Sequence, residues 1–144
     1  MDEGEAIPTA GYSRNPLNQK LGLKSGFRIA VINAPDRYWD LVHPLPDGAS
    51  VFGARARGLD FVHMFAERRA ELARALPKLI GRIKADGMIW ISWPKRTSGV
   101  ATDITEDVVR GIALPLGLVD VKVCAVDETW SALKLVIRVE NRPA

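Results

Sequence analysis

Short apolar runs closed by turn-forming residues alternate along the chain with segments of helical periodicity. Residues 27–35 (FRIAVINAP), 58–66 (GLDFVHMFA) and 88–94 (MIWISWP) are nearly continuous apolar runs. Runs of this length between turn residues indicate strands that are buried on both faces. Residues 49–54 (ASVFGA) indicate a shorter and weaker strand.

Helical periodicity is clearest in residues 67–87. The apolar positions of this segment form a single stripe at helical spacing: Leu72, Leu76, Leu79, Ile80 and Ile83. Pro77 lies inside the pattern and should kink the helix or divide it in two. A short helix is expected between Pro16 and Gly22, and residues 36–43 can form one or two helical turns.

The C-terminal third predicts one more helix and a hairpin. Asp103 as N-cap and Glu106 three residues later form a capping-box pattern, and Pro115 and Gly117 end the helix. Residues 118–126 and 131–139 then read as two strands joined by about five residues, so they should pair antiparallel. Strands separated by helical crossovers imply a parallel sheet with right-handed connections. We therefore expect an α/β fold with three layers, whose mostly parallel sheet ends in an antiparallel β-hairpin.

Composition indicates one globular domain. The 144 residues are 47% hydrophobic and 26% charged. We expect a flexible tail at residues 1–15, which have no periodicity, and a single α/β domain at residues 16–140. The apolar runs are too short to span a membrane, and no secretory leader is visible. With a single cysteine, Cys124, no internal disulfide is possible, so we expect a cytoplasmic protein.

Residues 76–95, LPKLIGRIKADGMIWISWPK, resemble the helix, turn and mid-sheet strand of many S-adenosylmethionine-dependent methyltransferases. Residues 58–66 resemble the strand that precedes that helix. The resemblance covers about residues 25–138 and implies a Rossmann-like, methyltransferase-type fold. It also implies a glycine-rich loop after the first strand, through which the backbone would approach the methyl donor.

That loop is missing from the sequence. The first strand ends in Asn33, Ala34, Pro35 and Asp36, and no glycine occurs between Gly26 and Gly48. Pro35 also removes a backbone N–H from the segment that would hold the cofactor. We therefore expect no methyl donor in the standard mode, and no other cofactor is expected.

A second resemblance is to a family. Residues 12–26 (YSRNPLNQKLGLKSG), 93–110 (WPKRTSGVATDITEDVVR) and 117–136 (GLVDVKVCAVDETWSALKLV) are similar to the bacterial family catalogued as domain of unknown function 3052. The likeness covers residues 12–138. The family brings no established activity, so it implies an identity and no mechanism.

The loop after the third apolar run is the best candidate for a binding site. It consists of Lys95, Arg96, Thr97, Ser98 and Gly99. Open α/β sheets bind ligands beyond the carboxyl ends of their strands, and cations, hydroxyls and helix amides suit a phosphate or a carboxylate. Asn33 and Asp36, at the end of the first strand, are expected to face this loop. A solvated surface loop is the competing interpretation.

Other chemically active residues favour structural roles. Asp127, Glu128 and Trp130 lie in the hairpin turn, where they form the turn or close over a ligand as a lid. His63 lies in an apolar strand run and is expected to be a hydrogen-bonded core residue. Two lone histidines, His43 and His63, do not make a metal site, and no metal is expected. Arg74, Lys78 and Arg82 form a basic row on the long helix, for which a solvated face is the favoured interpretation.

Three functions remain open from the sequence. The favoured one is a reduced methyltransferase-like domain that binds a small anionic ligand or a protein partner non-catalytically. The second is an enzyme, a transferase with an atypical cofactor mode. The third is a nucleic-acid or ribosome-associated accessory protein, suggested only by the basic row and a pI near 9.2 at a net charge of +3.

Overall fold

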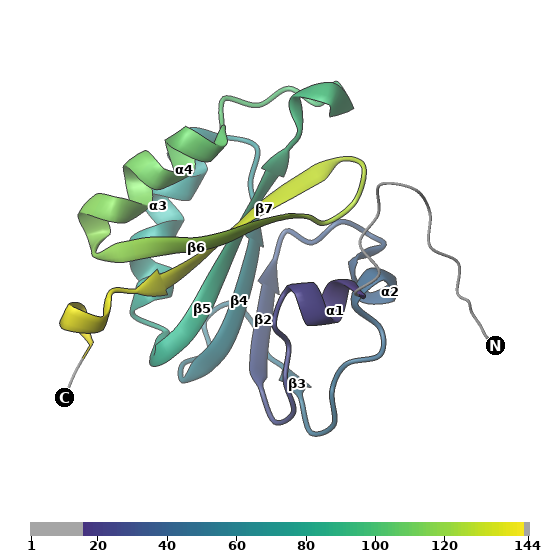
Figure 1. The fold of residues 1–144 in the computed structure, drawn as a ribbon, viewed down its shortest axis with the longest axis vertical. Coiled ribbons are helices and arrows are strands. Elements are labelled where there is room, and N and C mark those ends of the chain that lie inside the picture. The colour runs from purple at the N-terminus through teal and green to yellow at the C-terminus, as the bar shows by residue number, and fades with distance from the viewer. Residues whose placement is uncertain (1–15, 143–144) are drawn as a thin grey trace.

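A computed structural model describes residues 16–142, so the tail expected at residues 1–15 lies outside the described residues. A six-stranded sheet organises this part of the chain, in the order β3-β2-β4-β5-β7-β6 (Figure 1). The strands β3, β2, β4 and β5 run parallel, and β7 pairs antiparallel with both β5 and β6. This arrangement confirms the expected mixed sheet. The strands are β2 (Arg28–Ile32), β3 (Ser50–Val51), β4 (Leu59–Phe65), β5 (Ile83–Pro94), β6 (Leu118–Ala125) and β7 (Trp130–Ile137).

Helices cover both faces of the sheet and complete three layers. Helices α1 (Leu17–Lys20) and α2 (Tyr38–Val42) lie on one face, and α3 (Arg69–Ile80) and α4 (Glu106–Ala113) lie on the other (Figure 1). Among residues 16–142, none of the helices has the length and apolar character needed to cross a bilayer.

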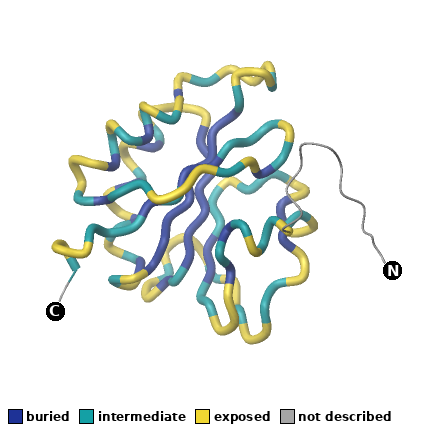
Figure 2. Tube along the Cα trace, in the orientation of Figure 1, coloured by how far each residue is buried: buried dark blue, intermediate teal, exposed yellow. Residues whose placement is uncertain are grey.

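The central strands are buried on both faces, as their continuous apolar runs predict. Figure 2 shows β4 and most of β5 as the darkest part of the trace. Trp90 packs into the core beneath α1 and α2, whereas Trp93, three residues later, packs into the core beneath α3 and α4. The two tryptophans therefore anchor opposite layers, as expected for residues of opposite parity on one strand.

The path of the chain reverses at β2. From β2 the chain crosses through α2 to β3 at the edge, then returns past β2 to form β4 on its other side. Such a reversal leaves a crevice outside the carboxyl ends of the two central strands, here β2 and β4, where open α/β folds bind ligands. The return connection, residues 52–58, contains no helix.

The boundary between α3 and β5 differs from the prediction. The helix ends at Ile80, and Ile83 begins β5 as the partner of Leu59, although it shares the core cluster of Leu72 and Leu76. Burial at this position was predicted correctly, but the element was wrong, because a strand residue can continue a helical apolar stripe by packing into the same core.

Pro77 does not divide α3, which runs unbroken through it. Pro77 and Ala73, whose carbonyl loses its usual helical donor, are both exposed. Water can therefore satisfy that carbonyl, which limits the cost of the proline.

Candidate functional site

The loop after β5 is held in a defined conformation by its own hydrogen bonds. Residues Arg96–Ser98 form a 3₁₀ turn, and Gly99 ends it with φ of 78°, in the left-handed region that favours glycine. The Ser98 hydroxyl donates to the Lys95 carbonyl (2.6 Å) and accepts from the backbone N–H of Val100 (3.1 Å). The Lys95 N–H donates to the Thr129 carbonyl at 2.7 Å, which ties the loop to the β6–β7 turn. The cationic side chains therefore project from an ordered support.

A cleft of about 580 Å³ opens beside this loop. It lies at the carboxyl end of β5, against the start of β7 and the approach to α4. Its volume is within the range of small-molecule sites. It is lined by Trp93, Pro94, Lys95, Arg96, Thr97, Val100, Ala101, Thr102, Ile104, Thr105, Glu106 and Ser131. The structure thus places Lys95, Arg96 and Thr97 of the predicted loop on a concave surface, with further hydroxyls beside them.

The start of α4 is capped differently from the prediction. Thr105 is the N-cap, and its Oγ1 accepts from the backbone N–H of Val108 at 3.2 Å. Asp103 instead accepts from the backbone N–H of Arg69 at 2.6 Å, at the first turn of α3. The capping-box assignment of Asp103 is therefore wrong: its carboxylate satisfies a helix 34 residues earlier in the chain, a contact that no local pattern encodes.

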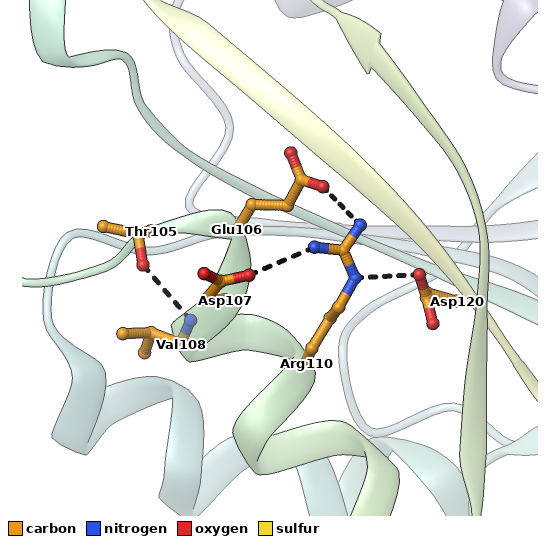
Figure 3. A network of polar contacts seen from close by, with 6 residues as sticks. All are labelled: Thr105, Glu106, Asp107, Val108, Arg110 and Asp120. Carbon is orange, nitrogen blue, oxygen red and sulfur yellow. Dashed lines mark hydrogen bonds and ion pairs between the residues drawn. The ribbon is translucent and has the colours of Figure 1, made fainter.

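The charge of Glu106, which lines the cleft, is partly offset by Arg110 (Figure 3). Arg110 forms ion pairs with Glu106 and Asp107 on its own helix and with Asp120 on β6. Its hydrogen bond to Asp120 is the largest influence that raises the pKa of Arg110, and the same bond lowers the pKa of Asp120. The carboxylate of Glu106 therefore repels an anion in the cleft less than an unpaired carboxylate would.

Asn33 and Asp36 do not join this cleft. Strand β4 lies between β2, which Asn33 follows, and β5, which carries the loop. Asn33 has a left-handed φ of 59°, and its Nδ2 donates to the Phe65 carbonyl (3.3 Å) and to Glu71 Oε2 (3.0 Å). It lines a separate cleft of about 290 Å³ beside α3. Asp36 is exposed and lines neither cleft.

The residues of the hairpin turn have structural contacts. Oδ1 of Asp127 accepts from the backbone N–H groups of Thr129 (2.8 Å) and Trp130 (2.9 Å), as a turn-forming aspartate does. Glu128 pairs with Arg37 at 3.5 Å, and both side chains are largely exposed. Trp130 is the first residue of β7 and packs edge-on against Phe65, with ring centroids 5.0 Å apart.

His63 lies in the core and is hydrogen-bonded, as expected, but its partners Tyr38 and Ser92, which form a buried polar chain with it, were not predicted. The Tyr38 hydroxyl lies 2.9 Å from His63 Nδ1, and Ser92 Oγ lies 2.7 Å from His63 Nε2. A signal was present: His63 alternates with Phe61 and Phe65 on one strand face, and Ser92 interrupts an apolar run.

The three side chains of this chain are essentially inaccessible to solvent, so it is not an open catalytic triad. Burial lowers the pKa of His63 to about 3 and is the main cause that raises the pKa of Tyr38 well above its ordinary value. His63 is therefore a neutral core histidine whose ring nitrogens are both hydrogen-bonded.

Within residues 16–142, no group of three or more His, Cys, Asp or Glu side chains has the geometry of a metal site. Cys124 is half-buried, and burial is the main influence that raises the pKa of its thiol.

Comparison with solved structures identifies the fold as methyltransferase-like. The chain is similar to a SAM-dependent methyltransferase from Aquifex aeolicus, with a TM-score of 0.63, 13% identity and coverage of 84% of this chain and 88% of that one. It is similar to magnesium protoporphyrin IX methyltransferase from Synechocystis, with a TM-score of 0.55, 10% identity and coverage of 84% and 76%. It is also similar to Aeropyrum pernix fibrillarin, solved with natively bound S-adenosyl-L-methionine, with a TM-score of 0.50, 14% identity and coverage of 81% of this chain and 69% of that one.

No protein-family model and no curated protein matches the chain. Its similarity to domain of unknown function 3052 therefore remains an expectation drawn from the sequence. At identities of 10–14%, the likeness to solved structures concerns the fold alone.

Proposed function

We propose that this protein is a reduced methyltransferase-like domain that binds a small anionic ligand, without catalysis, in the cleft beside the loop at residues 95–99. The observation that carries the proposal is the position of Lys95 and Arg96 on the wall of a cleft of about 580 Å³. A concave site of this volume suits a small molecule better than the flat surface of a protein partner.

The lining of the cleft matches an anionic group attached to a small apolar body. Two cations stand beside the hydroxyls of Thr97 and Ser131, and Trp93, Val100 and Ile104 supply apolar walls. Cations and hydroxyls together stabilise a phosphate or a carboxylate through charge-assisted hydrogen bonds. The pairing of Glu106 with Arg110 reduces the repulsion that such a ligand would meet.

The residues at the carboxyl ends of β2 and β4 support the proposal that methyl-donor binding has been lost. The side-chain amide of Asn33, at the end of β2, crosses the crevice between the two strands and donates to the Phe65 carbonyl at the end of β4. Pro35 offers no backbone donor, and α2 begins only three residues later at Tyr38, whose ring packs against His63 and Phe65. An asparagine side chain and an aromatic ring thus stand where a glycine-rich loop would let the backbone approach a cofactor.

A thermal-shift screen followed by calorimetry tests the proposal. The screen covers sugar phosphates, nucleotides, dicarboxylates and S-adenosylmethionine. The best anionic hit should lose its binding to Lys95→Ala/Arg96→Ala, while the melting temperature of the unliganded variant stays within about a degree of the original, because both side chains leave the core untouched. Lys20→Ala/Lys24→Ala removes the same charge from the opposite face and should bind normally.

The outcomes separate the candidate functions. Unchanged binding to Lys95→Ala/Arg96→Ala would remove the site assignment. A shift of several degrees with S-adenosylmethionine would instead favour the second candidate, a transferase with an atypical cofactor mode, for which the methyltransferase-like fold is the supporting observation.

A further inference from the structure

The smaller cleft exists because one connection of the sheet lacks a helix. It has a volume of about 290 Å³ and lies between the flank of α3 and the ends of β2 and β4, with Ile32, Met64 and Leu79 among its lining residues. Parallel strands are usually joined by a crossover helix, but residues 52–58 pass from β3 to β4 without one. Within residues 16–142, the flank of α3 that faces the β3 edge is therefore not covered by a neighbouring helix.

Three cations line this cleft. Arg74 and Lys78 lie four residues apart on α3, whereas Arg82 lies two residues beyond the end of the helix at Ile80, so the predicted row is not wholly helical. Like charges four residues apart on a helix, such as Arg74 and Lys78, repel each other. Among the ion pairs of residues 16–142, none involves these three side chains. A bound anion would relieve the repulsion.

The carboxylate that lines the cleft, Glu71, is already engaged. Its Oε2 accepts the hydrogen bond from Asn33 Nδ2 at 3.0 Å. Asn33, which the sequence analysis expected to face the loop at residues 95–99, therefore belongs to this second cleft, where it holds the carboxylate of Glu71 near the basic residues. Three cations against one engaged carboxylate leave the cleft positively charged.

Arg82 is held in place before any ligand arrives. Its side chain is half-buried, and one guanidinium N–H donates to the Ala54 carbonyl at 2.8 Å. Arg57 adds a second hydrogen bond between the same two segments by donating to the Gly81 carbonyl at 3.2 Å. A guanidinium has five N–H donors, so this bond fixes Arg82 while leaving donors for a ligand, and such preorganisation lowers the entropic cost of binding.

We infer that this cleft binds the phosphate group of a small phosphorylated molecule, at a site separate from the cleft at residues 95–99. Arginine forks and a lysine ammonium are the side chains that hold phosphate oxygens. Among the residues that the structure describes, the lining contains no aromatic side chain, so these residues offer no stacking platform for the bases of a nucleic-acid strand. The small volume also favours a compact phosphoester. The two clefts share no lining residue, so this inference does not depend on the proposed function.

The test uses ribose 5-phosphate and inorganic phosphate at millimolar concentration, followed by ³¹P NMR and calorimetry. Arg74→Gln/Lys78→Gln keeps good helix formers and leaves the anchored Arg82 in place. It should weaken ribose 5-phosphate binding by about tenfold to a hundredfold, because each charge-assisted hydrogen bond contributes more than a neutral one. Ribose without phosphate should not bind.

Lys20→Gln/Lys24→Gln is the matched control, since it removes the same charge from positions that line neither cleft and should retain binding. Unchanged binding in Arg74→Gln/Lys78→Gln, or an equal loss in both variants, would overturn the assignment. So would the absence of binding by both phosphates, or tight binding of a single-stranded RNA oligonucleotide alone with steep salt dependence, which would identify the row as a nucleic-acid contact.

Discussion

Oδ1 of Asp103 lies 2.6 Å from the backbone nitrogen of Arg69, so the loop that leads into α4 closes the first turn of α3. The neighbouring Thr102 hydroxyl donates to the Glu67 carbonyl at 2.6 Å and accepts from the Ile104 N–H at 3.1 Å. Two side chains thus fasten the wall of the larger cleft to the end of β4. The free N–H groups of a helix start make it a favourable place for a carboxylate.

Removing this contact should destabilise the fold. Asp103→Ala is expected to lower the free energy of unfolding by about 1 kcal/mol, the usual cost of losing a side-chain helix cap. Asp103→Asn should recover most of the loss, since an amide oxygen also accepts the bond. Urea unfolding measures both. Asp107→Ala, on the exposed first turn of α4, should change stability less. Equal losses for Asp103→Ala and Asp107→Ala would contradict the capping role.

Acid should destabilise the protein through His63. Its pKa in the fold is about 3, below the ordinary value near 6.5, because burial disfavours the charged ring. Below about pH 6.5, the unfolded chain therefore binds a proton at this histidine that the folded protein does not bind. The free energy of unfolding then falls as the pH drops, by up to about 1.4 kcal/mol per pH unit. Urea unfolding between pH 7 and pH 5 measures this slope before most carboxylates titrate.

His63→Gln isolates this contribution. The variant should be less stable at pH 7, because Tyr38 and Ser92 lose their shared partner, but its stability should change little between pH 7 and pH 5. His43→Gln, at an exposed position, should keep the original slope. A slope that persists in His63→Gln would assign the acid sensitivity to other groups.

The strands and the hairpin could be predicted because each is encoded by a continuous local pattern. What the local pattern could not supply is which distant element meets which. Ile83 continues the helical stripe yet pairs with Leu59 in the sheet, and Asp103 fits a local capping box yet caps α3.

The candidate site shows the same division. Lys95, Arg96 and Thr97 were found together because they are consecutive and follow a predicted strand. Asn33 was expected to face them, but β4 inserts between β2 and β5 after the chain reverses. The cleft beside α3 arises from a missing crossover helix, which a row of cations in the sequence does not reveal.

The position of Lys134 in the sheet should destabilise the fold. It lies half-buried on β7 directly opposite Lys122 on β6, and its pKa is lowered by burial first and then by Lys122 and Lys24. Since the fold disfavours its charged form, the cost is full at neutral pH and is relieved as the pH rises through the folded pKa. Lys134→Gln should therefore increase the free energy of unfolding at pH 7 by about 0.2–1 kcal/mol, the range for a cross-strand pair.

Thermal and urea unfolding of Lys134→Gln check this expectation. Lys84→Gln removes the same charge but breaks an ion pair with Asp60 (3.0 Å), so it should be neutral or slightly destabilising. If both variants were stabilised equally, the gain would come from lowering the net positive charge and not from the Lys122–Lys134 pair.

Arg110 should influence the larger cleft without lining it. Arg110→Gln leaves Glu106 and Asp120 without their cationic partner, and Glu106 lines the cleft. The unpaired Glu106 should then repel an anion held by Lys95 and Arg96, weakening the best anionic hit of the screen about two- to fivefold, as expected for partly exposed charges. Calorimetry on Arg110→Gln and on Arg110→Gln/Glu106→Gln separates charge from structure. Recovery of affinity in the double variant supports the electrostatic explanation. If affinity stayed low after the Glu106 charge was removed, Arg110 would act by holding α4 against β6, and the cleft would depend on that packing.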